Sequence, residues 1–521
     1  MRIGVDVGGT NTDAALMNGD EVLASCKQPT TKNVSDGIIK AVTTVLNESG
    51  ILPSEIQCVM IGTTHFTNAF VERKKLLEVG IVRICLPAAQ GIPPLLDWPE
   101  DILTVIGSHR YIIQGGYQFD GRLNSPLDEQ AVINCAKDLK TKGIKTVAIT
   151  GLFSNVNGEM ELRAEKLIRQ ELGNISTSLS HKVGRSGILE RENATIMNAC
   201  LADLSSHVVN AFRDALDQLD IKAPFFISQN DGTLMTADYV EKYPILTFAS
   251  GPTNSMRGAA YLSGVKDALV ADIGGTTTDI GMLANGFPRE SSVTVDIGGV
   301  RTNFRMPDVL ALGLGGGTVI SSDENSHLKI GPQSVGYQLL EKSRVFGGDT
   351  LTTTDIAVAA GYADIGNKSK VVDLPSEVIE QAVGRIHQIV EEGIDRMKMS
   401  ADPMPLILVG GGSVLINRKI EGVSEIIVPE HAGVANAIGA AIAQVAGEID
   451  TVISYDKIGR DKAIEQAKLE AIEQAISLGA IKESIVFLDI DETPLAYAPD
   501  GAVRLRVKVA GDLNITAISA Q

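Results

Sequence analysis

Short apolar runs alternate with segments of helical periodicity along most of the chain. Apolar runs between turn-forming residues are typical of buried strands, while apolar positions spaced by three and four residues predict amphipathic helices. This alternation is typical of the α/β class, in which helices cover the faces of a sheet. The predicted strands include 3–5, 56–61, 145–150, 224–228 and 268–271, and the predicted helices include 36–48, 68–75, 159–172, 192–219 and 434–446.

Two regions depart from this alternation. The segment 93–99, rich in proline and aromatic residues, and the glycine-containing segment 111–122 predict surface loops or a hairpin insertion. Near the end of the chain, 461–480 predicts an amphipathic helix, followed by two strands around the turn Pro499-Asp500-Gly501. Apolar and basic residues alternate cleanly over 503–509, as in a half-buried strand. We therefore expect a small α+β appendage at the end of the chain.

One pattern occurs twice. Asp6-Val-Gly-Gly-Thr-Asn-Thr-Asp13 and Asp272-Ile-Gly-Gly-Thr-Thr-Thr-Asp279 both read D-x-G-G-T-x-T-D. Each copy lies between two apolar runs and is followed by an Asn-Gly pair, at Asn18-Gly19 and at Asn285-Gly286. Each copy thus predicts a strand, a tight glycine loop, a second strand and a hairpin turn. The repeat indicates two related halves that face one phosphate chain.

The two loops have the chemistry of phosphate sites. Glycine lets the backbone approach a ligand closely, and the N–H groups and Thr hydroxyls suit phosphate oxygens. A carboxylate repels phosphate, so Asp6 and Asp272 make sense beside Mg²⁺, where they hold the metal with its water shell or orient a nucleophile. We expect Asp13 and Asp279 to fix the loop shape. The alternative is that both copies are plain hairpins. The predicted phosphate-binding residues are Gly8, Gly9, Thr10, Asn11, Thr12, Gly274, Gly275, Thr276 and Thr277.

Other phosphate motifs do not fit. The chain has no G-x-x-x-x-G-K-[ST], and a Rossmann loop would open a helix where a strand is predicted here. A third glycine cluster, Gly410-Gly411-Gly412, follows an apolar run that begins at Leu406. The ordered set resembles the actin-like ATPase superfamily, in which two ribonuclease-H-like domains clamp ATP. That resemblance implies that Gly410, Gly411 and Gly412 contact the adenosine.

Composition narrows the class of protein. The 521 residues leave room for two or three domains, and a formal charge of −18 argues against nucleic acid or an anionic membrane as the main partner. The five cysteines are scattered without C-x-x-C spacing, which indicates reduced thiols and no zinc or iron–sulfur site. Neither a signal peptide nor an apolar stretch of about 20 residues is visible. We therefore expect a cytoplasmic protein.

Further motifs carry a more specific resemblance. The sequence resembles the hydantoinase A/5-oxoprolinase family from residue 1 to about 450. The chain is shorter than the large members of that family, and Asn11 stands where the family often has an aromatic residue. Besides the two loops, the matching motifs are Gly62-Thr-Thr-His-Phe-Thr-Asn68, Glu72-Arg-Lys74, Ser180-His181, Glu190-Arg-Glu192 with Asn198, Gln229-Asn-Asp-Gly-Thr-Leu-Met235, Ser250-Gly-Pro252, Gly313-Leu-Gly-Gly-Gly317 and Pro429-Glu-His-Ala-Gly433.

The resemblance implies a function and further site residues. Members of the family use ATP to open hydantoins, lactams or 5-oxoproline, or serve as subunits of ATP-dependent carboxylases. By this resemblance Thr64 and His65 lie at the catalytic cleft with Asp6 and Asp272, and Gly315 and Gly316 line the nucleotide or the substrate. The expected cofactors are ATP and Mg²⁺, with Asp6 and Asp272 as the metal-binding residues.

The hypothesis is an ATP-dependent hydrolase of cyclic amides, or the ATP-binding subunit of one, that activates the carbonyl by phosphorylation. A carboxylase subunit, a small-molecule kinase and a nucleotide-gated reactivase or chaperone-like switch are the alternatives. The expected partners are a cyclic amide substrate, a hydantoinase B-like subunit and further copies of the chain in a homo-oligomer. We expect an N-terminal domain over 1–180, a second ATPase-like domain over 181–450 and a small C-terminal domain over 451–521.

Overall fold

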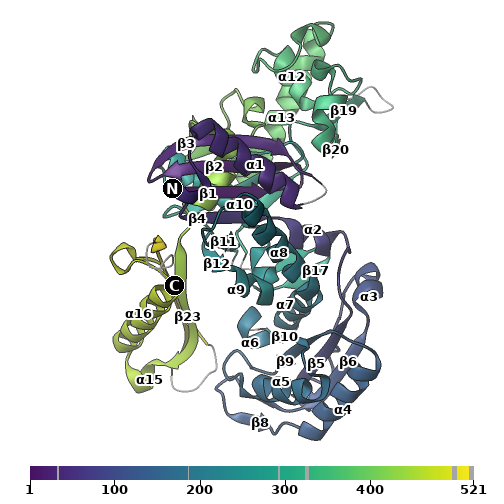
Figure 1. The fold of residues 1–521 in the computed structure, drawn as a ribbon, viewed down its shortest axis with the longest axis vertical. Helices are drawn as coiled ribbons and strands as arrows, with labels where there is room; N and C mark the ends of the chain where they lie inside the picture. Colours follow the sequence, from purple (N-terminus) through teal and green to yellow (C-terminus); the bar gives the residue numbers. More distant parts are fainter. Residues whose placement is uncertain are drawn as a thin grey trace.

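A computed structural model describes residues 1–31, 34–185, 187–291, 294–304, 306–322, 328–495 and 501–515 of the chain. Figure 1 shows the sheet that contains the N-terminus in the upper half and two bodies below it, one of which carries the end of the chain. The predicted α/β class, with two related halves and an α+β appendage, is confirmed. In the described part of the chain, every helix is too short or too polar to cross a membrane.

The first sheet contains the first glycine loop. Its strand order is β12-β11-β4-β1-β2-β3, in which β1, β2 and β3 form an antiparallel meander and β1, β4 and β11 run parallel. Helices α1 and α14 pack against this sheet. Gly4 permits the close approach of α14, since a Cβ there would lie 2.0 Å from the Ala437 carbonyl oxygen. The bounds are Arg2–Val7 (β1), Asn11–Asn18 (β2), Glu21–Pro29 (β3), Cys58–Thr63 (β4), Phe225–Ser228 (β11), Leu234–Thr236 (β12), Val34–Ser49 (α1) and Ala435–Ala441 (α14).

The second sheet repeats this arrangement around the second loop. Strands β13 and β14 form an antiparallel hairpin, and β13, β21 and β22 run parallel. Helix α13 packs on this sheet, while α10 packs against both the sheet and α14. Gly258 and Gly439 allow this helix contact, because a Cβ on either would meet a backbone oxygen of the other helix within 2 Å. The bounds are Leu269–Ile273 (β13), Thr278–Ala284 (β14), Met404–Val409 (β21), Val423–Ile427 (β22), Ser250–Ser263 (α10) and Ser376–Met397 (α13).

A four-stranded parallel sheet, β10-β9-β5-β6, forms the lower body that bears α4 (Glu129–Thr141) and α5 (Glu159–Leu172) in Figure 1. The prediction of loops or a hairpin over 111–122 is wrong for its first residues, which belong to strand β6 beside β5. The apolar pair Ile112-Ile113 explains the strand, since it pairs with the buried β5. Segment 93–99 is a loop, as predicted. The strands are Val79–Leu86 (β5), His109–Gln114 (β6), Thr146–Gly151 (β9) and Ser176–Leu179 (β10).

The C-terminal body is an antiparallel sheet of order β23-β25-β24, covered by α16 (Arg460–Ser477). The helix buries alanines at four-residue spacing, and Gly447 of the sheet lets it come close, since a Cβ there would lie 1.9 Å from the Ala471 oxygen. Pro499 and Asp500 of the predicted turn lie outside the described residues. The strands are Val445–Ser454 (β23), Val486–Pro494 (β24) and Ala502–Gly511 (β25).

Three predicted helix boundaries are wrong. The helix predicted over 192–219 is two helices, α7 (Ile188–Cys200) and α8 (Ala202–Gln218), separated at Leu201. The helix predicted over 434–446 ends at Ala441, because the next residues turn to begin β23 and pair with β25. The helix predicted over 68–75 is α2 (His65–Val71), which stops before two residues with positive φ, Arg73 and Lys75. Periodicity alone does not reveal these changes of direction.

Candidate functional site

The two glycine loops meet at one cleft of about 500 Å³, formed where the two halves of the molecule face each other. It is the place where the carboxyl ends of β1, β13 and β21 come together. Most residues predicted to bind nucleotide line it, whereas Thr12, Gly315, Asp6, Thr64 and His65 do not. The predicted residues in the lining are Gly8, Gly9, Thr10, Asn11, Asp272, Gly274, Gly275, Thr276, Thr277, Gly316, Gly410, Gly411 and Gly412.

The loops have the same backbone geometry. Each is closed by one hydrogen bond of 2.9 Å, from the Gly8 N–H to the Asn11 carbonyl and from the Gly274 N–H to the Thr277 carbonyl. The paired strands place Asp6 directly opposite Asp13 and Asp272 directly opposite Asp279. The sequence repeat is therefore a structural repeat, and each loop leaves backbone N–H groups at the cleft.

The third glycine cluster fits tightly against the second loop. Gly410 has a φ of +83°, and a Cβ there would lie 2.4 Å from Asp272 Oδ1. Only glycine combines that conformation with that proximity. The Gly410 cluster thus brings a third strand end to the cleft.

Gly315 and Gly317 lie behind the second loop. The Gly317 N–H donates to the Gly275 carbonyl at 2.7 Å, and the Gly316 N–H donates to the Gly274 carbonyl at 2.9 Å. A Cβ on Gly315 would lie 2.7 Å from the backbone of Gly275. This segment therefore supports the second loop by direct backbone contact, and only Gly316 reaches the cleft wall.

At the first loop, an asparagine of α14 connects two carboxylates. Asn436 Nδ2 donates to Asp6 Oδ2 at 3.0 Å and to Asp13 Oδ2 at 2.8 Å. Asp6 accepts a second bond from Asn254 Nδ2 at 3.3 Å, and Lys27 Nζ bonds Asp13 at 2.6 Å. Burial, followed by the Asp13 charge, raises the pKa of Asp6 to about 6, and burial raises the pKa of Asp13 despite Lys27.

In the second loop, Ser255 Oγ donates to Asp272 at 2.5 Å. Burial raises the pKa of Asp272, and burial with the Asp272 charge raises the pKa of Asp279 to about 7. Within the described residues, no hydrogen-bond donor reaches the Asp279 carboxyl. Among the described residues, two carboxyls, Asp13 and Asp272, and one lysine, Lys27, line the cleft. Asp6 and Asp279 lie directly opposite them on the paired strands, and burial raises the pKa of all four carboxyls.

A divalent cation fits this electrostatic environment. No group of three His, Cys, Asp or Glu side chains in the described residues forms a closed metal site. Mg²⁺ does not need one, because it binds through one or two carboxylates, waters and phosphate oxygens. Asp13 and Asp272 line the cleft and can serve in that way. Asp6, predicted to hold the metal, is buried and does not line the cleft; it accepts from the Asn254 amide and shares the Asn436 amide with Asp13.

Thr64 and His65 adjoin the first loop without lining the cleft. The Thr64 N–H donates to the Val7 carbonyl at 3.2 Å, and a Cβ on Gly251 would lie within 4 Å of both Thr64 and Asp6. His65 Nδ1 pairs with Thr63 Oγ1 at 2.7 Å, and burial lowers the pKa of the imidazole to about 4. His65 is thus neutral at physiological pH and tied to its own strand end.

Sequence reasoning missed several side chains of the cleft. Lys27, Ser255 and Asn436 come from segments without a recognisable motif, although strand pairing of Asp13 with Lys27 follows from the predicted hairpin. An apolar part of the cleft lining was also missed. Glycine loops together with an apolar surface suit a ligand with a phosphate chain and a flat ring. The apolar side chains there are Tyr337, Leu339, Leu340, Phe346 and Ile365.

The fold and cleft thus define a two-lobed α/β protein with paired glycine loops, and comparison with known proteins gives its family. Residues 2–172 match the hydantoinase/oxoprolinase N-terminal region, and residues 191–365 match the hydantoinase/oxoprolinase model. The chain belongs to the hydantoinase/oxoprolinase family, as its motifs predicted.

Relatives with different activities are similar to this chain at nearly the same sequence identity. The chain is 25% identical to caprolactamase subunit alpha of Pseudomonas jessenii, over 85% of this chain and 70% of that one. It is 23% identical to the acetone carboxylase beta subunit of Xanthobacter autotrophicus, over 98% and 79%. The structure of the ATP-dependent caprolactamase superposes with a TM-score of 0.77 at 19% identity, covering 98% of this chain and 87% of the other. The likeness to the solved structure shows the fold.

Proposed function

We propose that this chain is the ATP-binding component of an enzyme that uses ATP and Mg²⁺ to open a cyclic amide, such as a hydantoin, a lactam or 5-oxoproline. The observation that supports this most directly is the pair of matched glycine loops facing each other beside Asp13 and Asp272. The loops offer backbone N–H groups to a phosphate chain, and the carboxylates suit the metal that accompanies it.

The proposed use of ATP follows from the low reactivity of amides. An amide carbonyl is a poor electrophile, so it must be activated before water can add to it. In the proposed reaction the carbonyl oxygen attacks the γ-phosphorus of ATP, and the bond to the β-phosphate oxygen breaks to release ADP. Water then adds to the activated carbon, the C–N bond breaks as the nitrogen takes up a proton, and an acyl phosphate is left. A second water hydrolyses the acyl phosphate to the carboxylate and inorganic phosphate. Glycine-loop donors placed at the phosphate chain lower the barrier to the first step.

We assign a different role to each group of residues in and around the cleft. Asp13 and Asp272 would hold Mg²⁺ or its waters, which neutralises charge on the transferred phosphate. Asp6 is proposed to position Asp13 through the shared Asn436 amide. Thr64, whose N–H donates to the Val7 carbonyl just before the first loop, and its neighbour His65 are proposed to shape the approach of the acceptor. The apolar lining near Phe346 would hold the adenine.

Phosphate release tests the proposal. Purified protein, alone and with a hydantoinase B-like subunit, is incubated with ATP, Mg²⁺ and a panel of lactams, hydantoins and 5-oxoproline. The expected result is substrate-stimulated release of phosphate together with a ring-opened product. Lack of stimulation by every cyclic amide in both forms would exclude the proposal. A stable phosphorylated product would instead identify a kinase.

The second candidate function is that of a carboxylase subunit. It is supported by the similarity of this chain to the acetophenone carboxylase gamma subunit and to the acetone carboxylase beta subunit. The same ATP site would then activate a different carbonyl compound. Replacing the cyclic amides by ketones with bicarbonate discriminates the two reactions, because only the carboxylase fixes labelled bicarbonate into an acid. We also propose that the chain works with a hydantoinase B-like partner subunit and forms a homo-oligomer. The proposed domains cover residues 1–180, 181–450 and 451–521.

A further inference from the structure

Lys27 is the one positively charged residue among the described residues that line the glycine-loop cleft. It belongs to β3, where strand pairing places it directly opposite Asp13 of β2. Its ammonium group lies 2.6 Å from Asp13 Oδ2. Asp13 and Asp272 bring two carboxylates to the same cleft, and a phosphate chain would add further negative charge. Lys27 can give that chain a full positive charge, provided that its ammonium group leaves Asp13.

The Asp13 carboxylate has one oxygen without a partner. Its Oδ2 atom accepts from both Lys27 and Asn436, at 2.6 Å and 2.8 Å, whereas Oδ1 is buried and has no hydrogen-bond partner among the described residues. The side chain is only 1% exposed. Buried acceptors in folded proteins are nearly always satisfied, so an open acceptor beside a cleft indicates a group that arrives with the ligand. A metal ion or a metal-bound water suits a carboxylate oxygen in that position.

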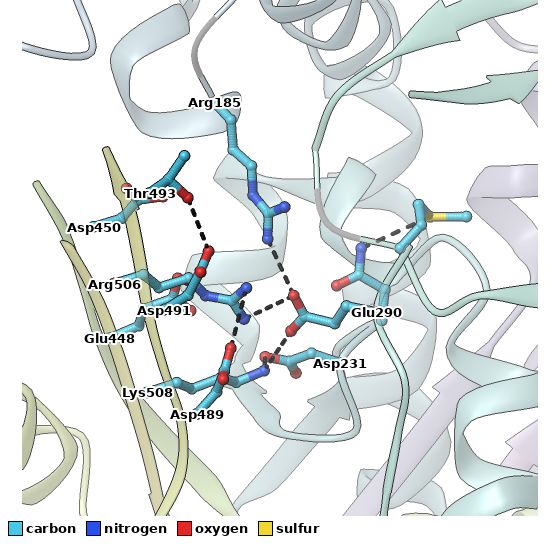
Figure 2. Close-up of polar contacts among 12 residues, drawn as sticks. Arg185, Asp231, Glu290, Glu448, Asp450, Asp489, Asp491, Thr493, Arg506 and Lys508 are labelled. Atoms are coloured by element: carbon cyan, nitrogen blue, oxygen red, sulfur yellow. Dashed lines mark hydrogen bonds and ion pairs between the residues drawn. The ribbon is translucent and has the colours of Figure 1, made fainter. Parts of the chain in front are cut away.

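A second buried ion pair shows how a permanent lysine contact is built in this protein. Lys508 is 5% exposed and lies 2.8 Å from Asp231 and 3.0 Å from Glu290 (Figure 2). Both oxygens of Asp231 are occupied, since Oδ1 accepts from Thr233. Burial, two carboxylate partners and a fully bonded aspartate hold Lys508 in place.

The Lys27 pair differs in each of these respects. The Lys27 side chain is 36% exposed, and Asp13 is its one carboxylate partner in the described part of the chain. A lysine carries its charge on a flexible four-carbon stem with three rotatable donors, so its ammonium group can turn from one oxygen to another. Asp13, by contrast, is held by strand pairing and by Asn436. Lys27 is thus the partner that can move.

Two cations compete for the Asp13 carboxylate. A divalent ion at Oδ1 would share it with the ammonium group at Oδ2, and two positive charges at that separation repel each other. Without nucleotide, Lys27 therefore opposes the binding of a metal at Asp13. A phosphate chain changes this balance, because it gives the ammonium group a new anionic partner and gives the metal additional oxygen ligands.

The metal also indicates which phosphate Lys27 meets. The Mg²⁺ that accompanies ATP bridges oxygens of the β- and γ-phosphates, so a lysine beside a metal-holding carboxylate lies near that end of the phosphate chain. The large apolar side chains of the cleft lining, which suit the ring, all belong to residues 337–365. Lys27 and Asp13 lie on the strands that follow the first glycine loop.

We propose that Lys27 is a counter-ion switch of the nucleotide site. In the nucleotide-free protein it pairs with Asp13 and keeps divalent cations away from that carboxylate. When a nucleoside triphosphate and Mg²⁺ bind together, the ammonium group leaves Asp13 and bonds the terminal phosphate. This assignment rests on the proposed ATP site and adds its regulation: the cleft takes up metal together with a triphosphate, and holds neither the metal alone nor a diphosphate as well.

The switch predicts opposite changes in two affinities when the charge is removed. Lys27→Met keeps the length of the side chain, and Lys40→Met, at an exposed position of α1 that does not line the cleft, is the matched control. Mn²⁺ alone is first titrated at pH 8 and followed by electron paramagnetic resonance. We expect K27M to bind Mn²⁺ roughly tenfold more tightly than the parent, because a repelling charge is lost. K40M should bind it as the parent does.

The second affinity is that for nucleotide. Binding of ADP and of a non-hydrolysable ATP analogue, each with Mg²⁺, is measured by calorimetry. We expect K27M to bind the analogue roughly tenfold more weakly than the parent, because a charge-assisted hydrogen bond is lost, and to bind ADP within about threefold of the parent. K40M should match the parent with both nucleotides.

Weaker binding of both Mn²⁺ and the analogue by K27M would make Lys27 a structural support and overturn the switch, as would unchanged affinities. An equal loss for ADP and the analogue contradicts the assignment to the terminal phosphate. Neither titration contains a cyclic amide, so the switch can hold while the proposed ring-opening reaction fails. Absence of nucleotide binding by the parent protein would refute the ATP site and the switch together.

Discussion

The two glycine loops share a sequence pattern and a backbone but not their surroundings. The second glycine of each loop is equally open, since an added Cβ would meet nothing closer than Asn68 at 3.7 Å on Gly9 and Thr10 at 3.8 Å on Gly275. The backbone of the second loop is in addition contacted by the backbone of Gly315 and Gly317. Asp13 has Lys27 and Asn436 as partners, whereas Asp279, its counterpart, has none among the described residues. The repeated sequence pattern therefore determines the hairpin, whereas the neighbouring residues determine the charge environment of each aspartate.

The largest expected effect comes from the cleft carboxylate of the second loop. Asp272→Asn should lower substrate-stimulated phosphate release by roughly 10²–10³-fold, because a preorganised charge beside the metal is lost. Asp214→Asn, an exposed residue of α8, is the matched control and should retain full activity. Steady-state phosphate release over a range of Mg²⁺ concentrations measures both. If D272N equals D214N, Asp272 has no part in the reaction.

The backbone contact of Gly315 with the second loop can be tested by comparing two glycine-to-alanine substitutions. Gly315→Ala should destabilise the protein by about 1–3 kcal/mol, since its Cβ would meet the backbone of the second loop at 2.7 Å. Gly9→Ala meets nothing closer than 3.7 Å and should leave the fold intact. Urea unfolding followed by circular dichroism gives the comparison. Equal midpoints for the two variants contradict the proposed support of the second loop.

A smaller effect should separate the two sets of hydrogen bonds. Asn436→Ala removes a donor from Asp6 and from Asp13, whereas Ser255→Ala removes one donor from Asp272. In N436A, Asp6 keeps Asn254 and Asp13 keeps Lys27, whereas in S255A the Asp272 carboxyl loses its one donor among the described residues. A buried acceptor left without a partner costs about 1–3 kcal/mol, so S255A should be the more damaging substitution. Calorimetric titration with nucleotide and thermal unfolding measure the two losses. A larger loss in N436A would show that the shared asparagine is the main support.

The smallest effect concerns pH and Asp279. Because its pKa is raised to about 7 from an ordinary value of 3.8, the folded nucleotide-free protein loses stability as pH rises through that interval. Asp279→Asn cannot ionise and should escape this loss. We expect its melting temperature to exceed that of the parent by several degrees, on the order of 5 °C, at pH 8 and to match it near pH 4. A constant difference at both pH values would rule out titration of Asp279 as the cause.

Much of this molecule follows from local sequence. The repeated D-x-G-G-T-x-T-D pattern predicted both hairpins, and the apolar run before Gly410 predicted the third strand end at the cleft. Periodicity predicted α5 to the residue, from Glu159 to Leu172. These features depend on residues close together in the chain, so hydrophobic spacing and glycine placement are enough to specify them.

Tertiary structure alone decided what surrounds the loops. Asn436 reaches Asp6 and Asp13 from more than 400 residues away, and no local pattern marks that asparagine. The break at Leu201 and the early end of α14 likewise depend on where the chain must pack next. The sequence by itself determined the family, the α/β class and the two glycine loops. Which carboxylates face the cleft, and which lie buried behind it, was decided by packing of the two halves, because burial and charge partners come from distant segments.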